Sequence, residues 1–267
     1  MRVALLGTGL MGDPMAEGLI RHGHTVSVWN RSSEKTARLK SIGAKVADDP
    51  ATAISGSDCT ILMLADANAI TETLLSQQTA DHIAGRTILQ MGTISPTQSK
   101  AIQRSVVSRG GEYLEAPVLG SIPEAQKSSL IVMVGAEPEQ FERWQLLLHA
   151  FGPRPILIGP VGHAAAVKLA MNQLIASMTA SFSLSLGLVQ SVGVDTERFM
   201  SVLRDSALYA STYDKKLQRM LERDYEKPNF PVKHLKKDVL LFLTEASSAG
   251  LATQCLIGLD DILNAAV

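Results

Sequence analysis

The sequence is poor in cysteine and has no excess of charge of either sign. Its two cysteines, Cys59 and Cys255, lie far apart and form no Cys-x-x-Cys pair, so a disulfide framework is excluded and both are expected to be buried thiols in a reducing compartment. The 25 lysines and arginines nearly balance 26 aspartates and glutamates, which leaves no basic field for nucleic acid. The six histidines show no spacing typical of metal ligands, so no metal site is expected.

Long hydrophobic runs and targeting signals are also missing. No uninterrupted apolar run of about 18 residues or more occurs, and the N-terminus does not read as a signal peptide. Hydrophobic residues make up 46% of the chain and charged residues 19%, as in ordinary globular proteins. We therefore expect a cytoplasmic protein with a small-molecule ligand and with neither a membrane nor a nucleic acid as partner.

The first half alternates short apolar runs with amphipathic stretches. The runs lie at residues 2–7, 25–30, 44–47, 59–64, 87–92, 112–118, 128–135 and 154–159. Strands that alternate with helices indicate a mostly parallel sheet covered on both faces. From about residue 161 the pattern is helical throughout. The sequence thus predicts an α/β fold, with an N-terminal Rossmann domain at 1–160 and an all-helical domain at 161–267, joined by a long helix.

That joining helix has an unusual composition. Residues 161–194 contain no proline and are apolar nearly all round, which predicts a helix buried on every side. Such a surface should not stay exposed, so the helix is also expected to bury an oligomer interface in a homodimer or homotetramer.

A glycine-rich turn follows the first predicted strand. Gly7, Gly9 and Gly12 form a G-x-G-x-x-G pattern, with Leu10 and Met11 inside it. The first glycine permits a tight turn, the second lets a pyrophosphate approach the backbone, and the third allows close packing of helix and strand. In this strand-turn-helix context the pattern favours dinucleotide binding over a structural turn.

The end of the second strand points to the form of the dinucleotide. Asn30, Arg31 and Ser32 stand where an NAD-specific protein usually offers a carboxylate to the ribose hydroxyls. A guanidinium and a hydroxyl suit a 2'-phosphate, so NADP is the expected cofactor, the alternative being that Arg31 is a surface arginine.

A candidate for the chemistry lies in the long helix. Lys168 and Asn172 are four residues apart and share one helix face. An isolated lysine there would most simply extend to the surface. Because a dinucleotide-binding turn also occurs upstream in the sequence, we interpret Lys168 as a catalytic group. It would supply a proton to a carbonyl oxygen and stabilise the negative charge that forms there during hydride transfer, and Asn172 would orient it.

Several motifs together resemble one family. The segments GTGLMGDPMAEGL, WNRSSEK, MLADANA, MGTISP, EAPVLGS, GHAAAVKLAMNQLIASM and FPVKHLKKDVLL occur in the order seen in β-hydroxyacid dehydrogenases. This family includes 3-hydroxyisobutyrate dehydrogenases and the glyoxylate/succinic semialdehyde reductases, and the NRS and FPVKHLKKD segments are most similar to the latter. The resemblance covers essentially the whole chain.

The resemblance implies roles for individual residues. Lys168 matches the family's catalytic lysine and Asn172 the asparagine that accompanies it, and both are expected to contact substrate. The helical domain is expected to close over the cofactor and bring both Lys168 and Lys237 to the nicotinamide. Further residues are implied at the cofactor, namely Leu64, Ala65, Thr93 and Lys237, and at the substrate, namely Leu119, Gly120, Ser121, Phe230 and Asp238.

Two departures from the family pattern concern the substrate. Leu119 stands where the family usually has serine, which removes one hydroxyl donor to a substrate carboxylate, although the N–H groups of Gly120 and Ser121 remain as candidates. The glycine-rich stretch that commonly follows is replaced by SIPEAQKSSL.

The expected activity is NADPH-dependent reduction of a small carboxylated aldehyde, glyoxylate or succinic semialdehyde, to the hydroxy acid. The alternatives are a 3-hydroxyisobutyrate-type dehydrogenase running oxidatively, an imine reductase, and a non-catalytic NADP-binding or sensing protein like the pseudo-dehydrogenase domains of chromatin proteins. Lys168 speaks against the imine reductase, and Lys168 with Asn172 against the sensor.

Overall fold

The chain folds into two compact units. The computed structural model describes residues 1–226 and 228–267. The first unit comprises Met1–Leu169 and the second Ala170–Val267. The boundary between them falls inside the long helix α8 (His163–Ser191), whose first turns belong to the sheet-containing unit.

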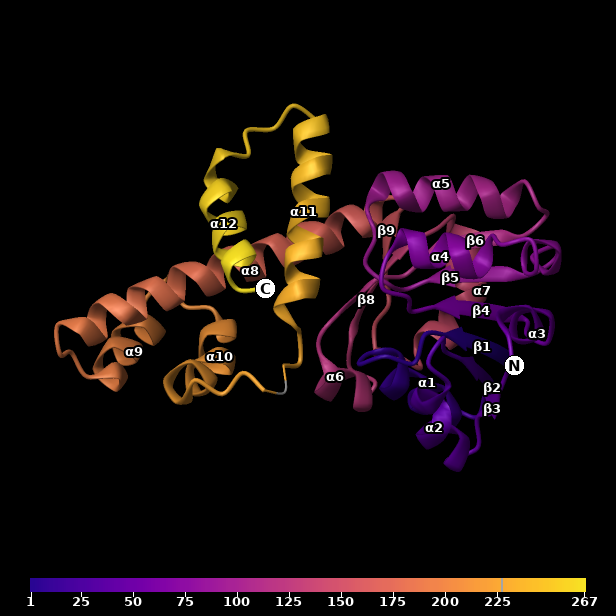
Figure 1. The fold of residues 1–267 in the computed structure, drawn as a ribbon, viewed down its shortest axis with the longest axis horizontal. Coiled ribbons are helices and arrows are strands. Elements are labelled where there is room, and N and C mark those ends of the chain that lie inside the picture. The colour runs from indigo at the N-terminus through magenta and orange to yellow at the C-terminus, as the bar shows by residue number, and fades with distance from the viewer. Residues whose placement is uncertain (227) are drawn as a thin grey trace. The chain divides into compact units, whose positions relative to one another are not determined.

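The first unit is built on one mostly parallel sheet (Figure 1). Its strands are β1 (Arg2–Leu6), β2 (Thr25–Trp29), β3 (Lys45–Val46), β4 (Cys59–Leu62), β5 (Thr87–Gln90), β6 (Glu112–Glu115), β7 (Val118–Leu119), β8 (Ile131–Gly135) and β9 (Ile156–Gly159). Their order in the sheet is β3-β2-β1-β4-β5-β6-β8-β7, with β9 paired to β8. The strands from β3 to β6 are parallel, whereas β8 runs antiparallel to β6 and β7. This order confirms the predicted Rossmann fold.

Helices cover both faces of this sheet. In chain order they are α1 (Gly12–Arg21), α2 (Ala37–Ser41), α3 (Pro50–Ser55), α4 (Ala67–Leu74), α5 (Pro96–Val107), α6 (Ile122–Gln126) and α7 (Pro138–Leu148), with short 3₁₀ turns at Ser33–Thr36 and Ala80–His82. Several begin at residue types that commonly cap helices: Asp49 caps α3, Asp66 caps α4, and Ser95 forms a capping box with Gln98 at α5.

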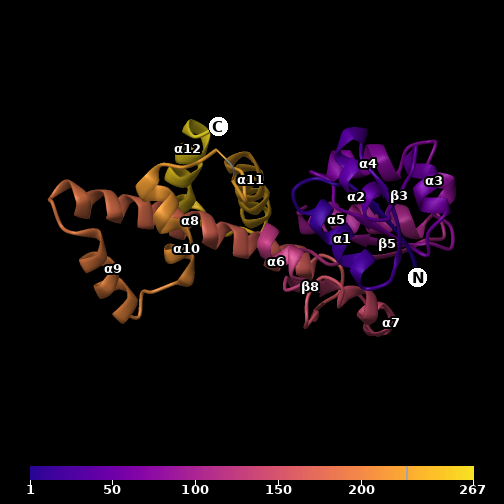
Figure 2. The same ribbon diagram turned by 90° about the horizontal axis from the view of Figure 1, so that it is seen from below.

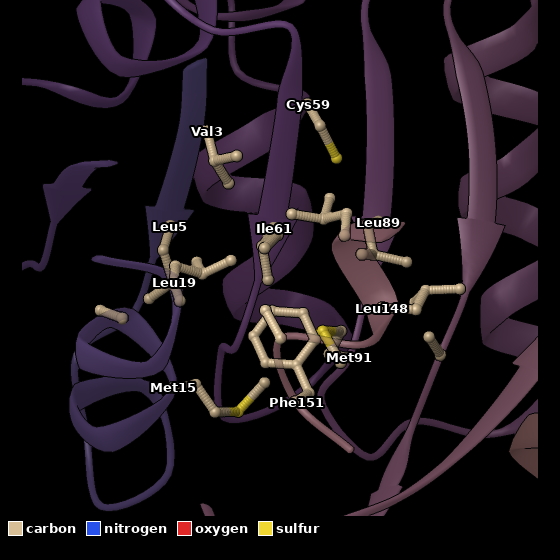
Figure 3. Close-up of a cluster of buried hydrophobic side chains, with 14 of the residues drawn as sticks. Val3, Leu5, Met15, Leu19, Cys59, Ile61, Leu89, Met91, Leu148 and Phe151 are labelled. Carbon is tan, nitrogen blue, oxygen red and sulfur yellow. The ribbon is translucent and has the colours of Figure 1, made fainter. Parts of the chain in front are cut away.

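Alternation along β1 divides the core of this unit in two. Val3 and Leu5 point to one face, where they join residues of α1 and α7 such as Met15 and Leu148 (Figure 3). Ala4 and Leu6 point to the other face, which is covered by α3, α4 and α5. Because the central strands β1, β4 and β5 are buried on both sides, their sequences are almost continuously apolar, as parallel strands usually are.

The second unit is helical. Beyond α8 it contains α9 (Thr196–Asp205), α10 (Ser211–Glu222), α11 (Val232–Ser248) and α12 (Ile257–Ala265), with a 3₁₀ turn at Gln254–Leu256. Asp195 caps α9, and α11 ends just before Gly250, whose φ of +74° suits a helix C-terminus. Figures 1 and 2 both show α9 and α10 beside the C-terminal half of α8, and the apolar cluster around Phe182 joins these three helices.

Three sequence expectations are wrong in detail. Residues 112–118 do not form one strand, because Pro117 has no N–H for the ladder and separates β6 from β7. Cys59 is buried but Cys255 is exposed. Helix α8 is not buried on every side within this chain, since Leu184 and Leu188 are 78% and 66% exposed.

By length and composition alone, α8 is also apolar enough to cross a membrane.

Candidate active site

The glycine turn has the geometry of a pyrophosphate cradle. Gly7 adopts a φ of +102°, and a Cβ atom there would lie 2.3 Å from the carbonyl oxygen of Met63. A Cβ at Gly12 would lie 1.8 Å from the carbonyl oxygen of Gly7, whereas one at Gly9 would meet no atom within 4 Å. Gly7 and Gly12 are therefore required by packing, and the backbone at Gly9 faces open space before the N-terminus of α1. These residues fit a dinucleotide, whose phosphates the free N–H groups there would bind.

Asn30 ties this turn to the end of β2. Its side-chain oxygen accepts a hydrogen bond from the N–H of Thr8 (3.1 Å), and its amide nitrogen donates to the carbonyl of Ser32 (3.0 Å). Asn30 thus fixes the loop that carries Arg31, an exposed residue, and Ser32, a half-buried one. The sequence did not indicate this role, because Asn30 was noted there only for occupying the position where a carboxylate is usual.

The other predicted cofactor residues of this unit gather at the same sheet edge. Gly7 follows β1, Leu64 follows β4 and Thr93 follows β5, and these strands are neighbours in the sheet. A Cβ at Gly92 would lie 2.8 Å from the carbonyl oxygen of Leu64, so the two loops touch. Ala65 is exposed beside Leu64. The carboxyl edge of a parallel sheet is where such folds bind ligands.

The segment expected to bind a substrate carboxylate is partly occupied. Leu119 is half-buried and Gly120 exposed, but the N–H and the hydroxyl of Ser121 both donate to Oε2 of Glu124, at 2.8 and 2.7 Å. A second carboxylate at Ser121 must displace Glu124 or meet its negative charge. The sequence interpretation missed Glu124, although the S-x-x-E spacing of a capping box signals it.

Two buried polar residues of α8 mark the possible proton-transfer site. Lys168 is 9% exposed and Asn172 is 2% exposed, one helical turn apart. Within the second unit the Asn172 amide donates to Oδ2 of Asp238 at 2.6 Å. The ammonium of Lys237 forms an ion pair with the same carboxylate, 3.1 Å from Oδ1. This Oδ1 atom accepts no hydrogen bond from the described residues. Asp238 is 2% exposed, so its carboxylate serves Asn172 and Lys237.

One face of α11 is strongly basic. An open hollow of about 370 Å³ is lined by Lys233, Lys236 and Lys237 together with Leu240, Leu241 and Thr244. Lys233 and Lys236 were not singled out from sequence, although Lys233 lies three and four residues before Lys236 and Lys237, a spacing that makes it a helix-surface neighbour of both. Burial, reinforced by Lys233 and Lys237, lowers the pKa of the neighbouring His234. Phe230 precedes this helix and is exposed. The face is suited to attract an anion.

Both units match known protein families. Residues 2–159 match the model described as the NAD binding domain of 6-phosphogluconate dehydrogenase. Residues 162–267 match the model described as NAD-binding of NADP-dependent 3-hydroxyisobutyrate dehydrogenase. The chain belongs to the β-hydroxyacid dehydrogenase family. Members of this family are NAD(P)-dependent dehydrogenases that act on hydroxy acids, and the chain is an oxidoreductase of this class.

Three proteins illustrate its position among β-hydroxyacid dehydrogenases. It is 33% identical to glyoxylate/succinic semialdehyde reductase 2, chloroplastic, of Arabidopsis thaliana, over 94% of this chain and 70% of that protein. It is 30% identical to the cytokine-like nuclear factor N-PAC of Xenopus tropicalis, over 94% of this chain and 47% of that protein, about half its length. A Mycobacterium tuberculosis 3-hydroxyisobutyrate dehydrogenase structure has the same fold, with a TM-score of 0.89, 20% identity, and coverage of 98% of this chain and 92% of that chain.

Proposed function

We propose that the protein reduces a small carboxylated aldehyde, glyoxylate or succinic semialdehyde, to the corresponding hydroxy acid with NADPH. The observation that carries this proposal is Lys168, a buried lysine one turn before Asn172 in a family of hydroxy acid dehydrogenases. The similarity to a glyoxylate/succinic semialdehyde reductase supports the choice of substrates. Such a lysine is costly to bury unless a partner or a reaction uses its charge.

In this proposal the polar groups of the candidate site have separate tasks. A bound nicotinamide would supply the hydride for the carbonyl carbon. Lys168 donates a proton to the carbonyl oxygen and stabilises the negative charge that develops there. Asp238 accepts from the amide of Asn172 and so holds that amide in one orientation toward the reacting groups. The lysines of α11, Lys237 foremost, attract the anionic substrate and cofactor.

The preference for NADPH rests on the end of β2. Arg31 is exposed there, Asn30 anchors the loop, and Asn30 stands where an NAD-specific protein usually has a carboxylate. Arg31→Ala is expected to raise the Kd of NADPH at least about tenfold while changing that of NADH less than about twofold, because only NADPH carries the phosphate. Equal weakening of the two cofactors would remove this assignment.

A second copy of the chain is the proposed partner of α8. Leu184 and Leu188 are four residues apart on one face of this helix and lie exposed in the single chain. Contiguous apolar surface of this kind marks an interface. The buried and polar groups at Lys168 and Asn172 fit a protein environment better than a lipid one. The proposal is therefore a homodimer or homotetramer, in the cytoplasm.

The deciding experiment follows NADPH oxidation with glyoxylate, succinic semialdehyde, tartronate semialdehyde, methylmalonate semialdehyde and a cyclic imine, for the wild type and Lys168→Ala. We expect turnover of one carboxylated aldehyde and its loss, by at least about a hundredfold, in the variant, with the Kd of NADPH nearly unchanged. Turnover of the imine, or full activity of Lys168→Ala, contradicts the proposal. NADPH binding without turnover of any compound would favour the non-catalytic alternative.

A further inference from the structure

Glu115, the last residue of β6, is a buried carboxylate that the proposed reaction does not use. It is 1% exposed. Its Oε1 accepts hydrogen bonds from the N–H groups of Gly162 (2.8 Å) and Ala165 (3.0 Å). Its Oε2 accepts from the hydroxyl of Ser99, which also lies 2.8 Å from the Tyr113 hydroxyl. All of these residues belong to the first unit. A buried carboxylate with this many donors is a built feature, since an unpaired one would be very costly.

The donors on Oε1 belong to the start of α8. This helix begins at His163, so the N–H groups of its first turn have no acceptor within the helix. The Glu115 carboxylate satisfies one of them, that of Ala165, together with the N–H of Gly162 directly before the helix, and it interacts favourably with the helix dipole. Glu115 therefore acts as a cap supplied from a distant strand, 47 and 50 residues away from its two donors.

The neighbouring strand is shaped to leave room for this carboxylate. Glu115 pairs with Gly135 across the antiparallel β6–β8 contact. A Cβ atom at Gly135 would lie 2.5 Å from Oε1 of Glu115 and 2.7 Å from its Cγ. Any side chain at position 135 would thus push the carboxylate away from α8.

The same first turn leads directly to Lys168. Ala165 precedes Lys168 by three residues, so the capped N–H and the lysine lie within one turn of each other. An α-helix advances about 1.5 Å and turns about 100° per residue, so the anchor that sets the first turn also sets the height and the direction of Lys168. Ser99 and Tyr113 hold the carboxylate from its other side.

We propose that Glu115 is a positioning residue for the reaction: its carboxylate fixes the start of α8 to the sheet and thereby aims Lys168. This inference rests on the proposed function, in which Lys168 is the proton donor. It predicts that the hydrogen bonds of Glu115 determine kcat without determining cofactor affinity, since Glu115 contributes no group to the glycine turn.

The test compares Glu115→Ala with Glu115→Gln. Glutamine keeps the shape, its oxygen can accept from the two N–H groups, and its amide can donate to Ser99. We expect Glu115→Ala to lower kcat at least about tenfold, with the KM of the aldehyde and the Kd of NADPH within about twofold of wild type, because misplacement of a catalytic group by about 1 Å can cost about a hundredfold. Glu115→Gln should recover most of that loss.

A matched control separates positioning from lost stability. Ile54→Ala removes a fully buried side chain of α3 and should lower Tm without lowering kcat per folded molecule. If Glu115→Ala does not fold, Gly135→Ala serves in its place, since it displaces the same carboxylate. The positioning role would be overturned by an unchanged kcat in Glu115→Ala, or in Gly135→Ala if that variant is used instead. It would also be overturned if Glu115→Gln had a kcat as low as that of Glu115→Ala.

A double-mutant cycle keeps this inference distinct from the proposed function. If Glu115 acts through Lys168, adding Glu115→Ala to Lys168→Ala causes no further loss of turnover. Turnover lost in Lys168→Ala but kept in Glu115→Ala refutes the positioning role alone. Turnover kept in Lys168→Ala refutes the proton donor, and with it the proposed function. A further loss of turnover in the double variant shows that Glu115 acts by another route.

Discussion

The two units of the molecule bury their apolar residues in opposite ways. The sheet unit closes two large clusters of fully buried side chains, one on each face of its sheet. The helical unit has two small clusters, one around Val239 and one around Phe182, while leucines of α8 remain exposed. A core of that size supplies less of the stabilisation that its helices need. The sheet unit thus buries its largest apolar clusters within itself, whereas the helical unit leaves apolar side chains of α8 exposed, and this exposure is the basis of the proposed interface.

The candidate site shows the same division. In the sheet unit the predicted site combines backbone geometry, set by glycines and strand ends, with one buried side chain, that of Lys168. In the helical unit it consists of side chains, chiefly the contact of Asn172 with Asp238. The predictions below act on one unit or the other.

The largest effect is expected in the glycine turn. Gly12→Ala places a Cβ against the carbonyl of Gly7 and should lower the free energy of unfolding by at least about 3 kcal/mol, because backbone cannot move aside cheaply. Gly9→Ala meets no atom and should leave that free energy within about 0.5 kcal/mol, while raising the Kd of NADPH at least about tenfold. Urea unfolding and cofactor titration measure the two quantities. Similar stability of both variants would contradict this reading of the turn.

The next effect concerns the exposed face of α8. The double change Leu184→Asp and Leu188→Asp should shift the oligomer to monomers, because charge is excluded from the core of an apolar interface. Light scattering during size-exclusion chromatography measures the mass. Leu146→Asp, at a residue of α7 that is 83% exposed, is the matched control and should leave the mass unchanged. A wild type that is monomeric would refute the interface.

A smaller loss is expected from the buried polar contact of the helical unit. Asn172→Ala leaves Oδ2 of Asp238 without its donor and should lower the free energy of unfolding by about 2 kcal/mol. The control is Gln173→Ala, at the next residue, whose amide donates to the hydroxyl of Ser177; this change should alter the free energy of unfolding by less than about 0.5 kcal/mol. Equal effects in urea unfolding would show that the contact with Asp238 contributes little.

Glu124 should affect substrate affinity modestly. Glu124→Gln removes a negative charge next to Ser121 and should lower the KM of a carboxylated aldehyde about threefold, with little change for a neutral aldehyde. Glu137→Gln alters a similar capping box at α7 and should leave both KM values unchanged. A KM that does not fall would place the substrate carboxylate elsewhere.

The smallest effect is a pH dependence at α11. The pKa of His234 in the folded chain lies below its ordinary value, so the unfolded chain binds protons more readily and stability is lost as the pH falls through about 6.5. His234→Gln should therefore lose less stability than wild type between about pH 7.5 and about pH 5.5, as measured by urea midpoints. An identical loss in both proteins would exclude this contribution.

Much of the sheet unit could be predicted because its signals are local. Seven of the eight apolar runs each became one strand, and Gly7, Gly9 and Gly12 stand at the turn, since period and glycine spacing act over a few residues. Lys168 and Asn172 were singled out because they share one face of an apolar helix, and their assignment to the reaction remains a prediction. The capping box of Ser121 and Glu124 was equally local, and its consequence for a substrate carboxylate was overlooked.

The remaining features depend on contacts that no local pattern contains. The donors of Glu115 lie on a helix far along the chain, and Asn172 and Asp238 are 66 residues apart. The exposure of α8 could not be predicted either, because an apolar helix has the same composition whether its own chain or another covers it. The exposure of Cys255 in a short 3₁₀ turn was not predicted either, because an apolar sequence context does not tell which of its residues face outward.

Helix α8 has a consequence for how this chain can vary. It is one unbroken helix of 29 residues that carries Lys168 in its sheet-unit part and Asn172 in its helical-unit part. One inserted or deleted residue between them would rotate Asn172 by about 100° relative to Lys168 and shift it by about 1.5 Å. A substitution between these two residues changes only local packing, whereas a change in the length of this stretch alters the relation between the two side chains that the proposal assigns to the reaction. We therefore expect this segment of α8 to tolerate substitutions better than insertions or deletions.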